Sequence, residues 1–192
     1  MKYSATAILI FLAVNSFAQT PFENSVIISY APAGFVSKVR MKAEFPISEK
    51  YSTGAFLSLY YLFFKGPEAE PFVRMYLSDE YPEGFYTQLK LSGGYFSSNM
   101  EFSHTFADSS VSSVKQNHSF PGIGIGLAFG YQYITRKQKH LDFFIGYKYM
   151  PFRGPDHVYV QGVTHRTEYD FYWYLIGPGS YFNGHFGIGY SF

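Results

Sequence analysis

The 192-residue sequence contains no cysteine, so a disulfide framework and an N-terminal lipid on a cysteine are both excluded. It holds 15 Lys and Arg against 14 Asp and Glu, and this balance argues against a nucleic-acid binder, which needs a basic surface. Beyond residue 18 no segment approaches 18 apolar residues, so helical membrane spans are excluded. If the chain is exported, its stability must come from an ordinary core or from a membrane.

The first 18 residues indicate a secretory signal peptide. Lys2 supplies the positive charge, Ala5–Val14 is a ten-residue apolar stretch, and Ser16 and Ala18 are small residues at the cleavage positions. A helix needs about 20 residues to cross a bilayer, so this stretch is too short to be an anchor. We expect cleavage after Ala18. Because Lys2 is the only charge removed, a charge-balanced single domain of residues 19–192 would remain.

Aromatic residues are abundant, with 19 Tyr and 22 Phe, yet the mean hydropathy is only −0.08. Such an average results when every second residue faces lipid and the others face a polar interior. Among structures that span a bilayer, only a closed barrel remains once helices are excluded. The predicted fold class is therefore all-β, a transmembrane antiparallel up-and-down β-barrel in the outer membrane of a Gram-negative cell.

Period-2 alternation supports this prediction along the whole chain. In residues 122–133 one face is aliphatic or aromatic and the other is mostly glycine, and in residues 35–45 one face carries four consecutive charges. Eight strands are predicted, at residues 25–31, 34–45, 52–64, 71–77, 84–100, 121–135, 140–150 and 181–192. Three short connections would then face the periplasm, and the two longest, residues 101–120 and 151–180, would lie outside.

Two alternatives for the strand count stay open. Residues 25–45 could form one bent strand, because the first strand is short and Pro32 follows it. Residues 158–162 and 169–175 could instead add a hairpin to the wall and make ten strands. Neither alternative changes the fold class.

Several motifs resemble those of known membrane barrels. The C-terminal residues 187–192 (GIGYSF) resemble the terminal strand by which the outer-membrane assembly machinery selects its clients, and its outward row would be Phe186, Ile188, Tyr190 and Phe192. Residues 71–76 (PFVRMY), followed by Gly84–Tyr86 and Gly94–Phe96, resemble a family of small bacterial outer-membrane β-barrels of unknown function, barrels of the OmpA type. The resemblance covers about two thirds of the chain and implies no activity.

Charged residues are expected inside the barrel. Six basic and two acidic side chains would face the lumen, namely Lys38, Arg40, Lys42, Arg74, Lys90 and Lys148 with Glu44 and Asp142. An eight-stranded barrel is just wide enough for its own side chains to fill it, so a general porin is not expected. The preferred interpretation is a plug of carboxylates, tyrosines and water, and the alternative is an anionic ligand at the mouth.

No residue pattern indicates catalytic, cofactor-binding or metal-binding residues. Ser103 and His104 are adjacent and would point to opposite faces of a strand, while Ser191 and His185 would lie about 20 Å apart. Five histidines are expected in loops or turns, with no pair at the spacing of metal ligands: His104, His118, His140, His157 and His165. A barrel enzyme that modifies lipid A remains the alternative.

The long external segments are the expected functional surface. Residues 105–116 are Ser-rich and expected to be solvated and mobile. Residues 169–176 (YDFYWYLI) could extend the sheet, cap the barrel, or offer Phe171, Tyr172, Trp173 and Tyr174 to an extracellular protein or glycan. The function predicted is that of a monomeric, non-enzymatic barrel with a structural or surface-interaction role. Its expected partners are outer-membrane lipid and, during biogenesis, the assembly machinery, and a narrow barrel that binds or conducts small anions is a further alternative.

The terminal aromatic gives the first testable prediction. Deleting Phe192 should lower the yield of protein in the outer membrane and leave the chain in the periplasm, as measured by membrane fractionation. Unchanged insertion of the truncated chain would contradict this role.

Overall fold

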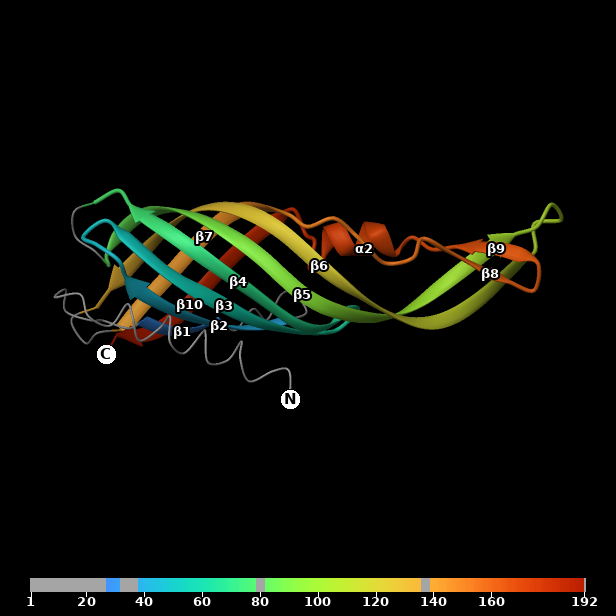
Figure 1. Ribbon diagram of the computed structural model, residues 1–192, viewed down its shortest axis with the longest axis horizontal. Helices are drawn as coiled ribbons and strands as arrows, with labels where there is room; N and C mark the ends of the chain where they lie inside the picture. The colour runs from blue at the N-terminus through green and yellow to red at the C-terminus, as the bar shows by residue number, and fades with distance from the viewer. Residues whose placement is uncertain (1–26, 32–37, 79–81, 136–138, 192) are drawn as a thin grey trace, which may run out of the picture.

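The computed structural model describes residues 27–31, 38–78, 82–135 and 139–191 (Figure 1). The expected signal peptide and Phe192 lie outside these residues. The elements are β1 (Ile27–Ala31), β2 (Lys38–Pro46), β3 (Tyr51–Tyr61), β4 (Lys65–Tyr76), β5 (Gly84–Thr105), β6 (Val111–Ile134), β7 (Lys139–Tyr149), β8 (His157–Val160), β9 (Val163–Arg166), α2 (Tyr169–Leu175) and β10 (Phe182–Ser191).

Seven strands, β2–β7 and β10, form an antiparallel sheet that curls into a half-barrel whose edges are 8 Å apart. The short strand β1 pairs with both edge strands, so that Ser29 lies opposite Lys42 of β2 and Gly189 of β10. Neighbouring strands in a sheet are about 4.8 Å apart, so the separation of the edges is close to two strand spacings. The prediction of an all-β, antiparallel, curled sheet is confirmed, but the seven strands form an open sheet, so the closed barrel of eight strands stays a prediction.

The two longest strands correct the prediction for residues 101–120. These residues were expected to form a loop, but β5 and β6 contain 22 and 24 residues and stay in register as far as Thr105 and Val111. Only residues 106–110 form the turn. There the Asp108 carboxylate accepts hydrogen bonds from the hydroxyl and the backbone N–H of Ser110, which lower the pKa of Asp108. The hairpin projects far beyond the rest of the sheet (Figure 1).

The segment between β7 and β10 also differs from the expectation. Strands β8 and β9 form a small hairpin that pairs with β5 at Ser103 and Arg166, so these two strands add to the projecting hairpin and not to the wall. Residues 169–175 form helix α2, so of the alternatives for this segment the extension of the sheet is wrong. Within the described residues, no helix is long and apolar enough to cross a bilayer. The five histidines expected in loops lie in strands β5 to β9.

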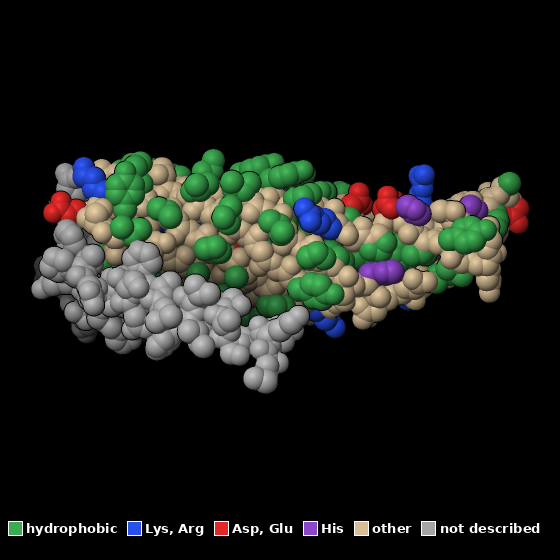
Figure 2. Space-filling model, in the orientation of Figure 1, with side chains coloured by type: hydrophobic (Ala, Val, Ile, Leu, Met, Phe, Trp, Pro, Cys, Tyr) green, Lys and Arg blue, Asp and Glu red, His purple; other side chains and the backbone are tan. Residues whose placement is uncertain are grey.

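The outer face of the curled sheet is apolar over a continuous band, and the projecting part of β5 and β6 lies beyond it. On β6 the residues at every second position, such as Leu127, are exposed, and the residues between them are buried or half-buried. This is the period-2 pattern predicted from the sequence. Figure 2 shows hydrophobic side chains gathered over this wall. Aliphatic residues fill the middle band: Val39, Met41, Leu57, Leu59, Val73, Leu89, Leu91, Ile123, Ile125, Leu127, Leu141, Ile145 and Ile188.

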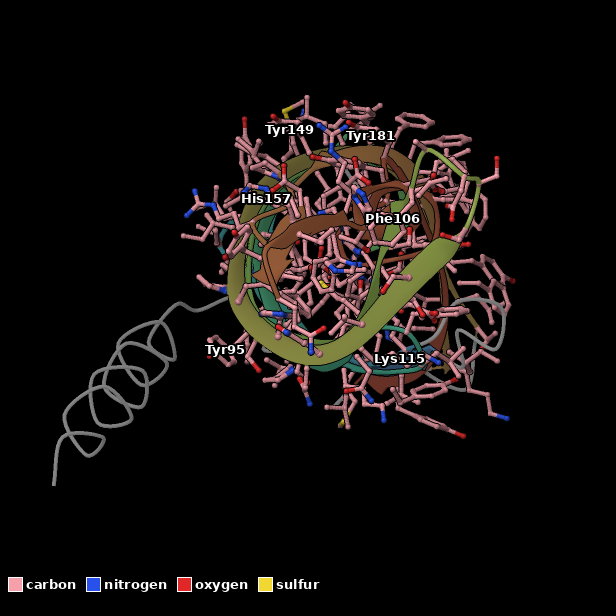
Figure 3. All side chains as sticks on the ribbon, turned by 90° about the vertical axis from the view of Figure 1, so that its right-hand side faces the viewer. Tyr95, Phe106, Lys115, Tyr149, His157 and Tyr181 are labelled. Atoms are coloured by element: carbon pink, nitrogen blue, oxygen red, sulfur yellow. The ribbon has the colours of Figure 1, made fainter. Side chains whose placement is uncertain are left out.

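Two rings of exposed aromatic residues flank this band. Tyr51, Phe85, Tyr131, Tyr133 and Tyr190 lie near the short turns, and Tyr61, Tyr95, Tyr147, Tyr149 and Tyr181 lie toward the projecting hairpin. Figure 3 shows Tyr95, Tyr149 and Tyr181 on the outside of the sheet. Along β5 the two rings are ten residues apart, which at a strand tilt of about 40° is about 26 Å along the axis of the curled sheet.

Candidate functional site

The interior of the curled sheet holds two layers of buried charge. The turn-side layer, near the short turns, contains Lys42, Glu44, Arg74 and Asp142. The hairpin-side layer contains Lys38, Arg40, Glu68, Glu70, Lys90 and Lys148. Side chains from all around the wall fill the space between the strands (Figure 3).

In the turn-side layer each carboxylate has several donors. Glu44 accepts hydrogen bonds from Lys42 Nζ and Arg74 Nη1, both at 2.8 Å, and from the hydroxyls of Ser52 and Tyr76. Asp142 Oδ2 accepts from Lys42 Nζ at 2.6 Å and from Arg74 Nη2 at 2.9 Å. Two cations therefore face two carboxylates, and this layer is neutral.

The hairpin-side layer pairs four cations with two carboxylates. Glu70 accepts from Arg40 Nη2 at 2.5 Å and from Lys90 Nζ at 2.8 Å, and Lys148 Nζ lies 2.8 Å from Glu68 and 3.6 Å from Glu70. Lys38 Nζ donates to Tyr60 at 2.7 Å and lies 3.6 Å from Glu68. With all these groups ionised, the layer carries two positive charges in excess.

The structure places all eight residues of the predicted charge cluster inside the sheet, but the prediction missed Glu68 and Glu70. It began the fourth strand at Pro71, whereas β4 begins at Lys65. Counting back from Arg74 in steps of two would have found both carboxylates, since they share its face. Among the described residues, the interior thus contains six Lys and Arg and four Asp and Glu side chains instead of six and two.

An aromatic layer separates the two layers of charge. Phe56 packs against Phe72 and Phe144, with ring centroids 4.9 and 5.7 Å apart, and the ring of His185 lies 5.0 Å from Phe144. Arginines stack on the same rings, since Arg40 lies 5.0 Å from Phe56 and Arg74 lies 4.9 Å from Phe72. These contacts fill the middle of the lumen with side chains.

A cavity of about 570 Å³ opens beside the hairpin-side layer. Lys38, Arg40 and Lys148 line its inner end, and Phe143, Ile145 and Phe182, which belong to the outer faces of β7 and β10, line its outer part. We call it the lateral pocket. Its size is within the range of small-molecule sites.

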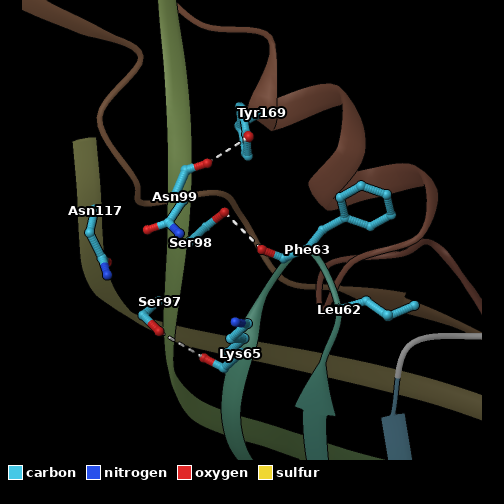
Figure 4. A pocket seen from close by; sticks show the side chains of 8 residues that line it. All are labelled: Leu62, Phe63, Lys65, Ser97, Ser98, Asn99, Asn117 and Tyr169. Atoms are coloured by element: carbon cyan, nitrogen blue, oxygen red, sulfur yellow. Dashed lines mark hydrogen bonds between the residues drawn. The ribbon is translucent and has the colours of Figure 1, made fainter. Parts of the chain in front are cut away.

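A second, polar pocket lies at the base of the projecting hairpin (Figure 4). Its volume is about 220 Å³, and its lining includes Lys65, Asn99, Asn117 and Tyr169. The Tyr169 hydroxyl donates to the backbone oxygen of Asn99 at 2.7 Å, which ties α2 to β5. Amides, hydroxyls and an ammonium here could contact a polar ligand such as a glycan.

The four aromatic residues predicted as an interaction surface have different positions. Phe171 and Tyr172 are exposed and Tyr174 is half-buried, but Trp173 is fully buried and its indole N–H donates to the Met150 oxygen at 2.7 Å. Trp173 packs in an apolar cap over the lumen with Tyr60, Phe64, Phe96, Met100, Phe102, Phe120 and Met150. Of these four residues, only Phe171 and Tyr172 are exposed, at 60% and 41%.

The described residues contain no cluster of three or more potential metal ligands. Ser103 and His104 are neighbours on β5 and so point to opposite faces, and His104 Nδ1 lies 3.0 Å from the backbone oxygen of Thr164. Three residues of the predicted assembly signal, Phe186, Ile188 and Tyr190, are exposed on the outer face of β10.

The neutral turn-side layer yields the second prediction. Glu44→Gln leaves Lys42 and Arg74 with one carboxylate, and the free energy of unfolding should fall by up to ~3 to 5 kcal/mol. The midpoint of heat-modifiability on gels measures the loss. Glu101→Gln is the matched control, because its pair with Lys115 is exposed and should change stability by less than about 1 kcal/mol. Equal midpoints for both variants would show that the buried network does not hold the fold.

Comparisons with protein families, with curated proteins and with solved structures found no match for this chain. Its function is therefore inferred from the geometry of its own residues.

Proposed function

We propose that the chain is a closed, eight-stranded β-barrel of the bacterial outer membrane, with a plugged lumen and a rigid hairpin that projects from the cell. In this proposal β1 completes the wall between β2 and β10, which it pairs with on either side. The hairpin and α2 then offer a surface for an extracellular protein or glycan. The role is non-enzymatic, and the barrel acts as a monomer.

The observation that carries the proposal is a change of composition along continuous strands. The outward face of β5 is apolar up to Tyr95 and then becomes polar, although the strand continues without a break. Beyond that point the outward residues are polar apart from Val111 at the hairpin tip, and they include Asn99, Glu101, Ser103 and Thr105 on β5, with Ser113, Lys115, Asn117 and Ser119 on β6. A change from lipid to water at the level of Tyr95 explains this pattern.

The aromatic rings support the same boundary. Membrane barrels have an apolar band about 25 Å tall with aromatic girdles at both interfaces, close to the separation of about 26 Å derived above. Between the two rings, the outward positions of the described strands carry no Asp, Glu, Lys or Arg. A soluble protein rarely exposes so large a continuous apolar surface.

The packed interior favours an interaction role over transport. Two layers of ion pairs, an aromatic layer and an apolar cap follow one another along the axis, and an eight-stranded barrel has little further space. The polar faces of the hairpin, the small pocket in Figure 4 and the exposed rings of Phe171 and Tyr172 lie beyond the apolar band. This projecting region is where a partner would bind.

An arginine scan of two exposed sites tests the membrane assignment. Leu127 and Val111 are exposed to the same extent, at 64% and 65%, but only Leu127 lies in the apolar band. Leu127→Arg should lower the free energy of folding into lipid vesicles by about 2 to 4 kcal/mol, whereas Val111→Arg should change it little. If the two variants fold equally well, the band does not face lipid.

Single-cysteine labelling tests the orientation. The sequence contains no cysteine, so each variant has a single thiol that can react. A membrane-impermeant maleimide should label Val111→Cys in intact cells, because this residue lies at the hairpin tip. Glu49→Cys, in the short turn between β2 and β3, should react only after the outer membrane is permeabilised. Labelling of Glu49→Cys alone in intact cells would reverse the orientation.

A further inference from the structure

Among the described interior residues, the excess of basic over acidic side chains is confined to one layer. The turn-side layer is neutral, whereas the hairpin-side layer sets Lys38, Arg40, Lys90 and Lys148 against only Glu68 and Glu70. Arg40, Lys90 and Lys148 are each at least 98% buried. Buried charges without a counter-charge are costly, so this layer favours the entry of an anion.

The lateral pocket gives an anion a way in. β10 pairs with β1 only from Ile188 to Ser191, and among the described residues no strand pairs with Phe182–Gly187 on the side away from β7. The pocket lies beside this unpaired stretch, with Lys38 and Arg40 of β2 on the opposite side. It therefore connects the outer apolar face to the cationic layer.

The lining changes in character from outside to inside. Phe143, Ile145 and Phe182 form the outer part and belong to the apolar face of the wall. Inside, Lys38 and Lys148 present ammonium groups, and both share the same carboxylate, Glu68. A ligand that satisfies both ends needs an apolar chain and an anionic head.

We propose that the lateral pocket binds a single-chain amphiphile with an anionic headgroup, which reaches it from the membrane beside residues 182–187 of β10. This inference rests on the proposed membrane barrel. The headgroup oxygens accept hydrogen bonds from Lys38, Arg40 and Lys148, and the acyl chain lies along Phe143, Ile145 and Phe182. A small anion from solution would satisfy the same cations, but it would leave the apolar part of the pocket unused.

A pair of isosteric substitutions separates this site from the rest of the lumen. Asn183 lines the pocket, and its Oδ1 accepts from Lys90 Nζ at 3.0 Å, so Asn183→Asp places a carboxylate in the layer that lacks one. Gln132→Glu is the matched control, because Gln132 accepts from Lys42 and Arg74 in the neutral layer and does not line the pocket. Asn183→Asp should stabilise the unliganded protein, and Gln132→Glu should not.

The binding experiment uses dodecanoate as the probe. The protein is placed in phosphatidylcholine nanodiscs and titrated calorimetrically with dodecanoate, with dodecanol and with sodium sulfate. We expect saturable binding of dodecanoate, binding at least about tenfold weaker in Asn183→Asp, and unchanged binding in Gln132→Glu. Dodecanol and sulfate should each bind more weakly than dodecanoate, because each satisfies one end of the pocket only.

Each other outcome overturns the proposal. Equal affinity for dodecanol would remove the role of the cations, and equal affinity for sulfate would make the site one for small anions. Absence of dodecanoate binding, or equal loss in both variants, would exclude the pocket. The Leu127→Arg comparison does not depend on the amphiphile, so failure of the membrane barrel itself would be recognised separately.

Discussion

The neutralisation of charge inside the curled sheet is the constraint on which the rest of the structure depends. Backbone ladders connect each strand only to its neighbours. Arg74 of β4, by contrast, bonds to Glu44 of β2 and to Asp142 of β7, and so joins strands on different parts of the wall. Because each of these charges would be costly to bury alone, the group is stable only when the strands that carry it are in register. The ion pairs thereby help to fix the cross-section of the fold.

The parts of the fold that could be predicted from sequence are those governed by period 2. Where one face of a strand is apolar and exposed and the other lines the interior, alternation identifies both faces, and residues 122–133 and 141–149 are oriented as predicted. The pattern is weak where polar residues are frequent on both faces and only a few apolar residues, such as Phe102 and Phe120, mark the inner one, because there is then little contrast to detect. For this reason residues 101–120 were predicted to form a loop, although most of them continue β5 and β6. Prolines at positions 67 and 71 similarly hid the first half of β4, and with it Glu68 and Glu70.

The candidate site was harder to predict than the wall, because its parts meet only in three dimensions. Lys38, Lys148 and Asn183 come from three strands, and nothing in the sequence shows that they line one pocket. Helix α2 was missed because its seven residues, five of them aromatic, have no alternation that distinguishes a helix from a strand. The burial of Trp173 was missed for the same reason. A helix turns one of these four adjacent aromatic residues inward and leaves Phe171 and Tyr172 exposed.

The packed lumen and the projecting hairpin are mechanically connected. Strands β5 and β6 are paired without interruption from Gly84 and Gln132 to Thr105 and Val111, so the hairpin is anchored along the full depth of the wall. Its buried face, through Met100 and Phe102, belongs to the same apolar cluster as Trp173 of α2 and Met150. A two-stranded ribbon alone is marginally stable in water, and here the cap and the β8–β9 hairpin supply the missing contacts. The cap over the interior therefore also fixes the position of the hairpin. In the proposed interaction role, a partner would meet a preorganised surface, and little conformational entropy would be lost on binding.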